Sequence, residues 1–351
     1  MNDSIAKNSN IKLSASGRIE YIDAMRGFTM ILVVLQHVAS FCWHVFGNAP
    51  SVHEYLIQFR MPMFFFISGF VLFKAGVTWD VQQIIRFFRK KIPVQLLSPF
   101  LFFFLYLFVT KQPLIEGISD PAKSGYWFTF VLLEYFIFYA VVRFFVRKTW
   151  ASSIILLVLG LIFYLPIQNV LPFSSFTMGT LSVVEWKYFL FFVLGTIVKE
   201  HFSRTEALLD SKWLLAICIL YYFIVNAFRN LIPVNELVIN LTLSLTGLTI
   251  VFAFFRKNQS LFSQQTVLGH SLQYIGRRTL DIYLIHYFLI PRNLDFVTVF
   301  VDHPMPIIEA TVSLLVTLII IAGCLLISNI LRLSPFLAHW LFGAKYPKIA
   351  Q

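Results

Sequence analysis

The sequence predicts an all-α, polytopic membrane protein with about ten transmembrane helices. Of its 351 residues, 58% are hydrophobic, and the mean hydropathy is +0.77. Only 13% are charged, whereas a soluble domain carries about 25% charged residues. The polar residues are also bunched. The apolar runs between them, about 17–25 residues long, suffice to cross a hydrocarbon core about 30 Å thick.

Charge separates the two sides of the predicted membrane domain. Of the 28 lysines and arginines, 22 fall on one side if the connections alternate. The positive-inside rule assigns that side, and both chain termini, to the cytoplasm. The six outer cations are Arg60, Lys111, Lys123, Lys187, Arg229 and Arg292. The predicted spans are residues 27–45, 61–78, 92–110, 126–146, 150–170, 182–198, 213–228, 236–255, 277–291 and 306–331.

The ends of the chain and its net charge suggest simple roles. Residues 1–17 are polar and are predicted to form a flexible cytoplasmic tail, followed by a membrane domain of residues 18–351. No cleavable signal peptide is expected, because the first apolar run lacks a small-residue cleavage pattern. The net charge of +11 suits a surface that faces anionic membrane lipids, so no nucleic-acid partner is expected. The three cysteines lie inside apolar segments and are interpreted as small buried residues.

The stretch YIDAMRGFTMILVVLQHVAS places Arg26 where the first apolar run begins and His37 well inside that run. Eleven residues make about three helical turns, so the two side chains share one face, about 16 Å apart along the axis. An ionisable group inside a bilayer is a functional candidate by default. This face would join a permanent cation at the cytoplasm to a titratable base in the interior. The spacing fits an interfacial anchor and a packed, hydrogen-bonded histidine equally well.

A second basic feature is RFFRKK, residues 86–91. If this segment is helical, Arg86, Arg89 and Lys90 project from one face, and Lys91 adds a fourth cation. Guanidinium groups bind phosphates bidentately, so the cluster would suit a phosphate-rich ligand such as a nucleotide or coenzyme A. Composition alone favours a simpler interpretation, an ordinary basic connection on the cytoplasmic side.

Four further ionisable residues lie within predicted spans. Asp281 follows Arg277 by four residues, which predicts a structural ion pair at a helix entrance. His286 lies deeper, and it fits either a second active-site imidazole or a hydrogen-bonding core residue. Glu134, near mid-span, could face lipid or could pair with a histidine or a substrate hydroxyl in a polar cavity. Glu309 is expected to reach water at the outer end of the last span.

Several catalytic patterns are missing from the sequence. Neither G-x-S-x-G nor the Walker A pattern occurs, and no histidine pair has metal-ligand spacing. This disfavours an ATP-driven or zinc mechanism, and no metal is expected. In the second span, Pro62 is expected to shape the helix, and Ser68 and Gly69 to permit close helix approach.

Six blocks of the sequence resemble successive blocks of the acyltransferase family 3 membrane proteins. They occur in family order from about residue 18 onward. The first block is the most specific, with an arginine, ten residues and then a histidine. The blocks are RIEYIDAMRGFTMILVVLQHV, MPMFFFISGFVLF, RFFRKKIPVQLLSPF, YWFTFVLLEYF, KYFLFFVLGTIVKE and LQYIGRRTLDIYLIHYFLI.

This resemblance implies transfer of an acyl group, usually acetyl from cytosolic acetyl-CoA. The implied acceptors are hydroxyls of extracytoplasmic or lipid-linked glycans such as O-antigen, capsule or exopolysaccharide, at a bacterial inner (cytoplasmic) membrane. Family roles carry over to Arg26 and His37 and to the pair Arg86 and Arg89, and more loosely to His286. Some members carry a soluble hydrolase-like domain after the membrane part. Here we expect the membrane part to perform all of the chemistry.

Two mechanisms fit these residues. In direct transfer, the cations of residues 86–91 hold acyl-CoA, and His37 takes a proton from the acceptor hydroxyl as it attacks the thioester. Arg26 then either holds the donor or polarises the thioester. In the alternative, His37 itself carries the acyl group across the membrane. The rival function is a transporter or exporter of a glycan or small organic acid, although no pseudo-symmetric repeat typical of transporters is visible.

Overall fold

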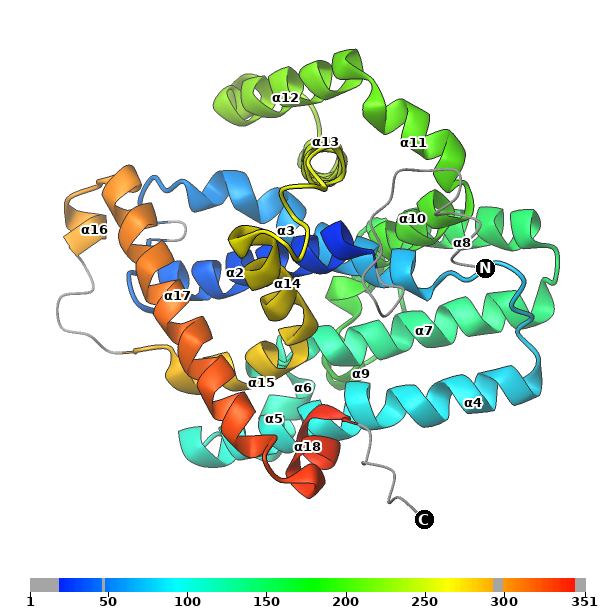
Figure 1. Ribbon diagram of the computed structural model, residues 1–351, viewed down its shortest axis with the longest axis horizontal. Helices are drawn as coiled ribbons and strands as arrows, with labels where there is room; N and C mark the ends of the chain where they lie inside the picture. Colours follow the sequence, from blue (N-terminus) through cyan, green and yellow to red (C-terminus); the bar gives the residue numbers. More distant parts are fainter. Residues whose placement is uncertain (1–18, 46–47, 293–298, 345–351) are drawn as a thin grey trace. The chain divides into compact units, whose positions relative to one another are not determined.

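The computed structural model describes residues 19–45, 48–292 and 299–344 as helices and their connections (Figure 1). The all-α prediction is confirmed. The predicted tail, residues 1–17, lies outside the described residues, as do Lys345 and Lys348 of the predicted cytoplasmic side. The chain divides into two compact units, and the three divisions fall inside helix α3, between α10 and α11, and inside helix α17.

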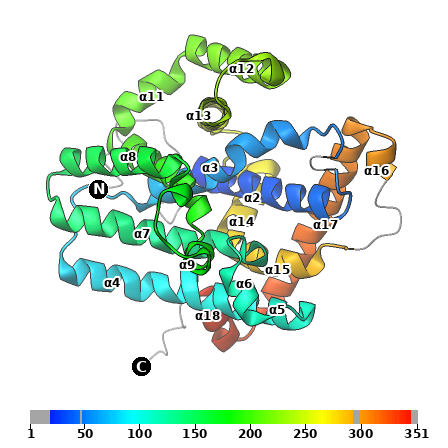
Figure 2. The same ribbon diagram turned by 180° about the vertical axis from the view of Figure 1, so that it is seen from behind.

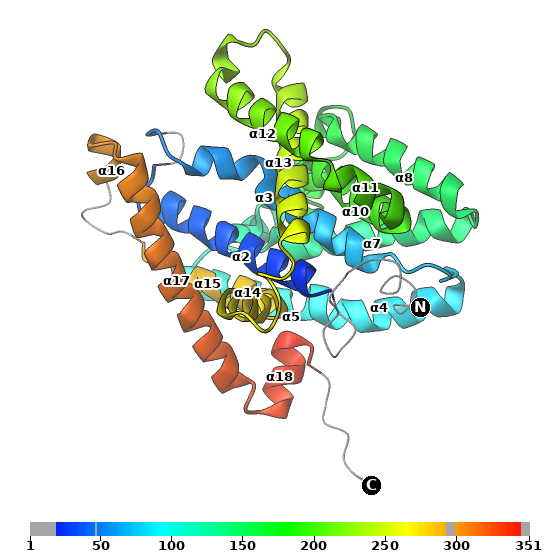
Figure 3. The ribbon, with the colours of Figure 1, turned by 45° about the horizontal axis from the view of Figure 1, so that its top comes forward.

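The first unit comprises the described residues up to Ile67 together with His201–Cys324. In this unit α2 packs against α13, α14 and α15, and α12 packs against α13 (Figure 3). Apolar side chains from α2, α3, α12 and α13 form a common core. The helices are α2 (Glu20–Phe41), α3 (His53–Leu72), α11 (Phe202–Asp210), α12 (Lys212–Ala227), α13 (Glu236–Lys257), α14 (Val267–Arg277), α15 (Thr279–Leu289), α16 (Val299–Asp302) and α17 (Pro306–Leu331).

The second unit comprises Ser68–Glu200 and the described residues from Leu325 onward. Here α4 runs beside α7 (Figures 1 and 2), and α8 packs against α10. A π-helical turn, Pro93–Leu97, joins α4 to α5, because Pro93 lacks the N–H that a regular α-helix requires. The helices are α4 (Val81–Ile92), α5 (Ser98–Thr110), α6 (Leu114–Ser119), α7 (Trp127–Phe145), α8 (Thr149–Tyr164), α9 (Ser175–Thr180), α10 (Phe189–Glu200) and α18 (Pro335–Phe342).

Six helical stretches in the described residues are long and apolar enough to cross a membrane. They are α2, α3, the continuous stretch Val81–Thr110, α7, α13 and α17. A bent pair, α11 and α12, would make a seventh if it counted as one span. The protein is therefore a multi-pass membrane protein. Each of the ten predicted segments overlaps a helix, but the count of ten and the cytoplasmic termini stay predictions.

Two glycines bring α2 and α14 into backbone contact. A Cβ atom on Gly27 would lie 2.0 Å from the carbonyl oxygen of Leu272, and one on Gly276 would lie 1.9 Å from that of Asp23. Small residues of this kind allow helices to approach closely in a membrane. Because α15 begins two residues after α14 ends, this crossing also sets α15 against α2.

The close approach predicted for the second span occurs at Gly69. A Cβ atom at this position would lie 1.9 Å from the carbonyl oxygen of Phe192 on α10. Pro62 lies within α3 without ending the helix. Close packing in α3 therefore follows from its small residue, as the sequence predicts.

Glu309, in the first turn of α17, is the centre of a buried polar group. Its carboxylate accepts hydrogen bonds from Ser51 Oγ at 2.9 Å and from Ser313 Oγ at 2.6 Å, and it lies 3.1 Å from Nε2 of His53. We call these four residues the Glu309 cluster. The expectation that Glu309 reaches water is wrong, because the carboxylate is 2% exposed and the segment around Ser51 and His53 contacts it.

Candidate active site

His37 on α2 lies against two consecutive residues of α15. Its Nε2 atom is 2.9 Å from the hydroxyl of Tyr287. The ring centroids of His37 and His286 are 5.4 Å apart, and those of His286 and Tyr287 are 4.1 Å apart. We call these three residues the α2–α15 cluster. His37 is half-buried, whereas His286 and Tyr287 are buried, so His37 is the most accessible of the three.

One ring nitrogen of His286 has no hydrogen-bond partner in the part of the chain that the structure describes. Its Nδ1 atom lies 3.0 Å from the carbonyl oxygen of Ile282. A carbonyl can only accept, so Nδ1 carries the proton, and Nε2 of the neutral ring carries a lone pair. This Nε2 atom is buried and has no hydrogen-bond partner among the described residues. Leaving such an atom unsatisfied costs about 1–3 kcal/mol. The position therefore suits a hydrogen-bond donor from a ligand or from water.

Two arginines act on the α2–α15 cluster. The Arg292 guanidinium lies 4.7 Å from the ring centroid of Phe41, and that ring stacks on His37 at 5.7 Å. Arg60, on α3, is 9% exposed, and both arginines interact electrostatically with His37. Fixed positive charge in a site of low water content stabilises negative charge that develops during acyl transfer.

Arg26 and His37 lie on one continuous helix, as predicted. The Arg26 side chain is 36% exposed, and its Nη1 atom lies 4.0 Å from Oδ1 of Asp23, one turn earlier. Separations of this length contribute little to stability at an exposed position. Arg26 therefore keeps a partly accessible guanidinium about three turns from the imidazole.

Asp281 forms an ion pair, but with a different arginine from the one predicted. Its Oδ2 atom lies 3.1 Å from Nη1 of Arg278, and the pairing with Arg277 is wrong. The reason is a break in the helix. Residue 277 ends α14, and Arg278 caps a new helix with φ −108° and ψ 16°. Residues 277 and 281 therefore do not share a face, and Asp281 in the first turn of α15 meets the capping residue.

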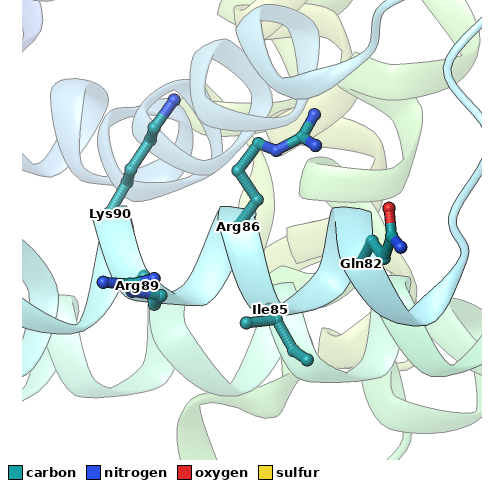
Figure 4. A pocket seen from close by; sticks show the side chains of 5 residues that line it. All are labelled: Gln82, Ile85, Arg86, Arg89 and Lys90. Atoms are coloured by element: carbon teal, nitrogen blue, oxygen red, sulfur yellow. The ribbon is translucent and has the colours of Figure 1, made fainter.

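The basic segment of residues 86–91 forms part of helix α4. Three of its cations, Arg86, Arg89 and Lys90, are exposed, and these three make no ion pair with a described residue. Figure 4 shows Gln82, Arg86 and Lys90 extending from the same side of the helix, with Arg89 beside them. An open pocket of about 560 Å³ is lined by Gln82, Ile85, Arg86, Arg89 and Lys90.

Lys91 lies on the other face of α4. Its ammonium group is 4.7 Å from the ring centroid of Phe136 on α7 and 5.7 Å from that of Phe87. It does not line the pocket. A cation over an aromatic face is attracted by the ring quadrupole, so the observed contact of Lys91 is with α7. Its predicted role in binding the donor stays a prediction.

Glu134 belongs to the second unit. Its carboxylate accepts a hydrogen bond of 2.7 Å from Nε1 of Trp186. Lys123, which precedes α7, interacts with Glu134 electrostatically and donates a hydrogen bond of 2.9 Å to the carbonyl oxygen of Gly179. Burial lowers the pKa of Lys123 to about 8. The described contacts of Glu134 are thus with an indole and a buried lysine.

Sequence reasoning identified both histidines but missed Tyr287, Arg60 and Arg292. Tyr287 directly follows His286. The chain has 14 tyrosines, so the residue type alone does not single out Tyr287. Arg60 and Arg292 were visible as two of the six predicted outer cations. Among the described residues, no three His, Cys, Asp or Glu side chains form a group that could hold a metal ion.

Comparison with known proteins places the chain in a family. Residues 19–329 of the 351 match the family described as "Acyltransferase domain", that is, acyltransferase family 3. No curated protein and no solved structure gave a significant match. The match includes all three residues of the α2–α15 cluster and the basic face of α4. Because it covers most of the chain, this multi-pass membrane protein belongs to acyltransferase family 3.

Proposed function

We propose that the protein transfers an acyl group, in the first instance acetyl, from cytosolic acyl-CoA to a hydroxyl of a cell-surface or lipid-linked glycan. The proposed location is the cytoplasmic (inner) membrane of a bacterium. The observation that carries the proposal is the pair of neighbouring imidazoles in the α2–α15 cluster, where one buried nitrogen lacks a hydrogen-bond partner among the described residues. In a membrane acyltransferase, such an arrangement suits the transfer of a proton to and from a bound hydroxyl.

His37 acts as the general base in this proposal. As the acceptor oxygen bonds to the acyl carbon, its proton passes to the imidazole. Collapse of the tetrahedral intermediate then breaks the carbon–sulfur bond, and the proton passes from the imidazolium to the leaving thiolate. General acid–base help of this kind contributes about 10²–10⁴-fold. The half-buried position of His37 supports this role, because the base must meet both substrates.

Three further candidate residues supply contacts to the substrates. His286 accepts a hydrogen bond from a substrate donor at its unpartnered Nε2 atom. Arg26 holds the donor or polarises its thioester, and its partial exposure fits either task. Glu134, in the second unit, stays a candidate for contact with the acceptor, and its carboxylate already accepts a hydrogen bond from Trp186.

Helix α4 is the proposed binding site for the donor phosphates. Arg86, Arg89 and Lys90 are exposed, lack anionic partners among the described residues and line one open pocket. Arginine pairs bind phosphate bidentately, and a coenzyme A headgroup carries several phosphate charges. The match to an acyltransferase family favours an enzyme over a transporter. An acyltransferase needs an acyl donor, whereas a transporter does not.

The first test is acyl transfer by His37→Gln. Membranes that contain the wild-type protein should transfer label from radiolabelled acetyl-CoA to surface glycan, and the variant should lose at least about 10²-fold in rate. His44→Gln is a matched control, because His44 is an exposed histidine in the connection that follows α2. Near-normal transfer by a folded, inserted His37→Gln protein would sink the general-base role.

The second test addresses the donor site. We expect the double variant Arg86→Ala, Arg89→Ala to raise the KM for acetyl-CoA by at least about 10²-fold with little change in kcat, because each charge-assisted hydrogen bond contributes about 1.5–3 kcal/mol and the variant removes two arginines. Arg147→Ala, Lys148→Ala removes two exposed cations elsewhere in the same unit. An equal rise in KM for this control would contradict the donor site, and the α4 cations would then have a role in membrane topology alone.

A further inference from the structure

The hydroxyl of Tyr287 makes an unusual contact for a buried tyrosine. The hydroxyls of Tyr135 and Tyr222 donate to the backbone carbonyls of Glu185 and Tyr55. The Tyr287 hydroxyl instead lies 2.9 Å from an imidazole nitrogen, Nε2 of His37. A phenylalanine would fill the same space with the same ring. The oxygen atom of Tyr287 therefore has a function that packing alone does not require.

This contact decides which nitrogen of His37 is available to a substrate. Because Nε2 is occupied by Tyr287, only Nδ1 remains to take a proton from an acceptor hydroxyl. Nδ1 of the neutral ring is basic only if the ring proton is on Nε2. In that tautomer the His37 Nε2–H donates to the phenolic oxygen of Tyr287, which acts as the acceptor.

We propose that Tyr287 is a positioning residue that holds His37 in the Nε2–H tautomer and thereby makes Nδ1 the catalytic base. The inference rests on the proposed general-base role of His37 and extends it to a second residue. When Nδ1 takes the proton of the acceptor hydroxyl, the ring becomes a cation, and its Nε2–H bond to the phenol strengthens. The same proton leaves from Nδ1 to the departing thiolate, and the Nε2 proton stays in place throughout.

The geometry of the two helices supports this role. Tyr287 is 3% exposed, and the glycine contact between α2 and α14 fixes the neighbouring α15 against α2. A group that orients a base must itself be held rigidly, since small displacements reduce the fraction of productive geometry. The phenol thus stands in the place that a carboxylate occupies beside the histidine of many acyl-transfer enzymes.

The kinetic test is Tyr287→Phe, with Tyr283→Phe as the matched control. Tyr283 is buried one turn earlier on α15, with its ring 6.2 Å from that of His286. We expect Tyr287→Phe to lower kcat on the order of tenfold, the loss of about one hydrogen bond, with both KM values unchanged. Tyr283→Phe should leave kcat near the wild-type value. An unchanged kcat for Tyr287→Phe, or an equal loss in both variants, would overturn the proposal.

A double variant separates this inference from the proposed function. In a His37→Gln background, Tyr287→Phe should cause no further loss, because the imidazole that it orients is gone. A further tenfold loss in that background would assign Tyr287 a separate role and overturn the proposal. If His37→Gln alone is fully active, the general-base role fails. If only Tyr287→Phe is fully active, the positioning role alone fails.

The tautomer itself can be observed by NMR. Histidine-selective ¹⁵N labelling distinguishes protonated from unprotonated ring nitrogens, and the His37→Gln spectrum identifies the resonances of His37. At alkaline pH, where the ring is neutral, we expect the proton on Nε2 in the wild-type protein and a mixture of tautomers in Tyr287→Phe. A proton on Nδ1 of wild-type His37, or an identical spectrum in the variant, would contradict the assignment.

Discussion

His53 and His286 are both buried histidines of the first unit, at 3% and 0% exposure, but their surroundings differ. In the Glu309 cluster, the Glu309 carboxylate lies within hydrogen-bond distance of the His53 ring and accepts hydrogen bonds from two serine hydroxyls. In the α2–α15 cluster, Nδ1 of His286 bonds to a backbone carbonyl, whereas Nε2 has no partner among the described residues.

The difference is the one that we expect between a structural polar group and a reactive one inside a membrane. Both clusters contain the residue types that a bilayer disfavours. The Glu309 cluster recovers the desolvation cost through its own hydrogen bonds, so it needs no ligand. The α2–α15 cluster leaves an acceptor unsatisfied, which is tolerable if a substrate or water supplies the missing donor. Hydrogen-bond satisfaction, rather than residue type, separates the two.

The largest expected effect is on stability, in Glu309→Ala. The substitution removes the carboxylate that three side chains share and leaves a buried His53 without its partner. Breaking a buried pair in this way costs about 3–5 kcal/mol. We expect a clear fall in the midpoint of thermal unfolding in detergent, with normal acyl transfer by the molecules that remain folded.

Glu236→Ala is the matched control for this prediction. Glu236 also lies in the first turn of a long apolar helix, and it pairs with Arg229, but its side chain is 63% exposed. Exposed pairs contribute little to stability, so the midpoint should change little. Equal shifts in the two variants, or a specific loss of turnover in folded Glu309→Ala, would remove the distinction between the clusters.

Much of the fold could be predicted from hydrophobicity. The predicted segment 306–331 coincides with α17, and segment 126–146 differs from α7 by one residue at each end, because long apolar runs between polar residues set the helix lengths. Helix α14 was missed because its mixed pattern, Val267–Arg277, is too short and polar for a span. The contact between α2 and α14 at Gly27 and Gly276 was also missed, because a tertiary contact cannot be predicted from the hydrophobic periodicity of either helix.

The candidate site was predictable in its residue types but not in its contacts. His37 and His286 stood out because ionisable groups are rare in apolar runs. Tyr287 gave no such signal in a chain that is 17% aromatic. The contact of Lys91 could have been found, because Phe87 and Lys91 are four residues apart and therefore share the face of α4 that packs on α7.

The sharpest version of the comparison uses one substitution in both clusters. We expect His286→Gln to lower turnover by about 10–10²-fold, because the substrate loses a hydrogen bond at a buried position, which is worth about 1–3 kcal/mol. Its unfolding midpoint should stay near the wild-type value, because the imidazole bonds to backbone groups of its own helix, at Ile282 and Tyr283, and not to another helix among the described residues. Acyl transfer and thermal unfolding measured on the same preparation give both quantities.

His53→Gln should show the opposite pattern. Glutamine can restore part of the contact with Glu309, so we expect a loss of stability of about 1 kcal/mol and unchanged turnover per folded molecule. If His286→Gln instead lowered stability and spared turnover, the unpartnered nitrogen would be a packing defect filled by water. The two clusters would then differ only in degree. Opposite patterns in two buried histidines of one unit would instead mean that the missing partner of His286 is the substrate.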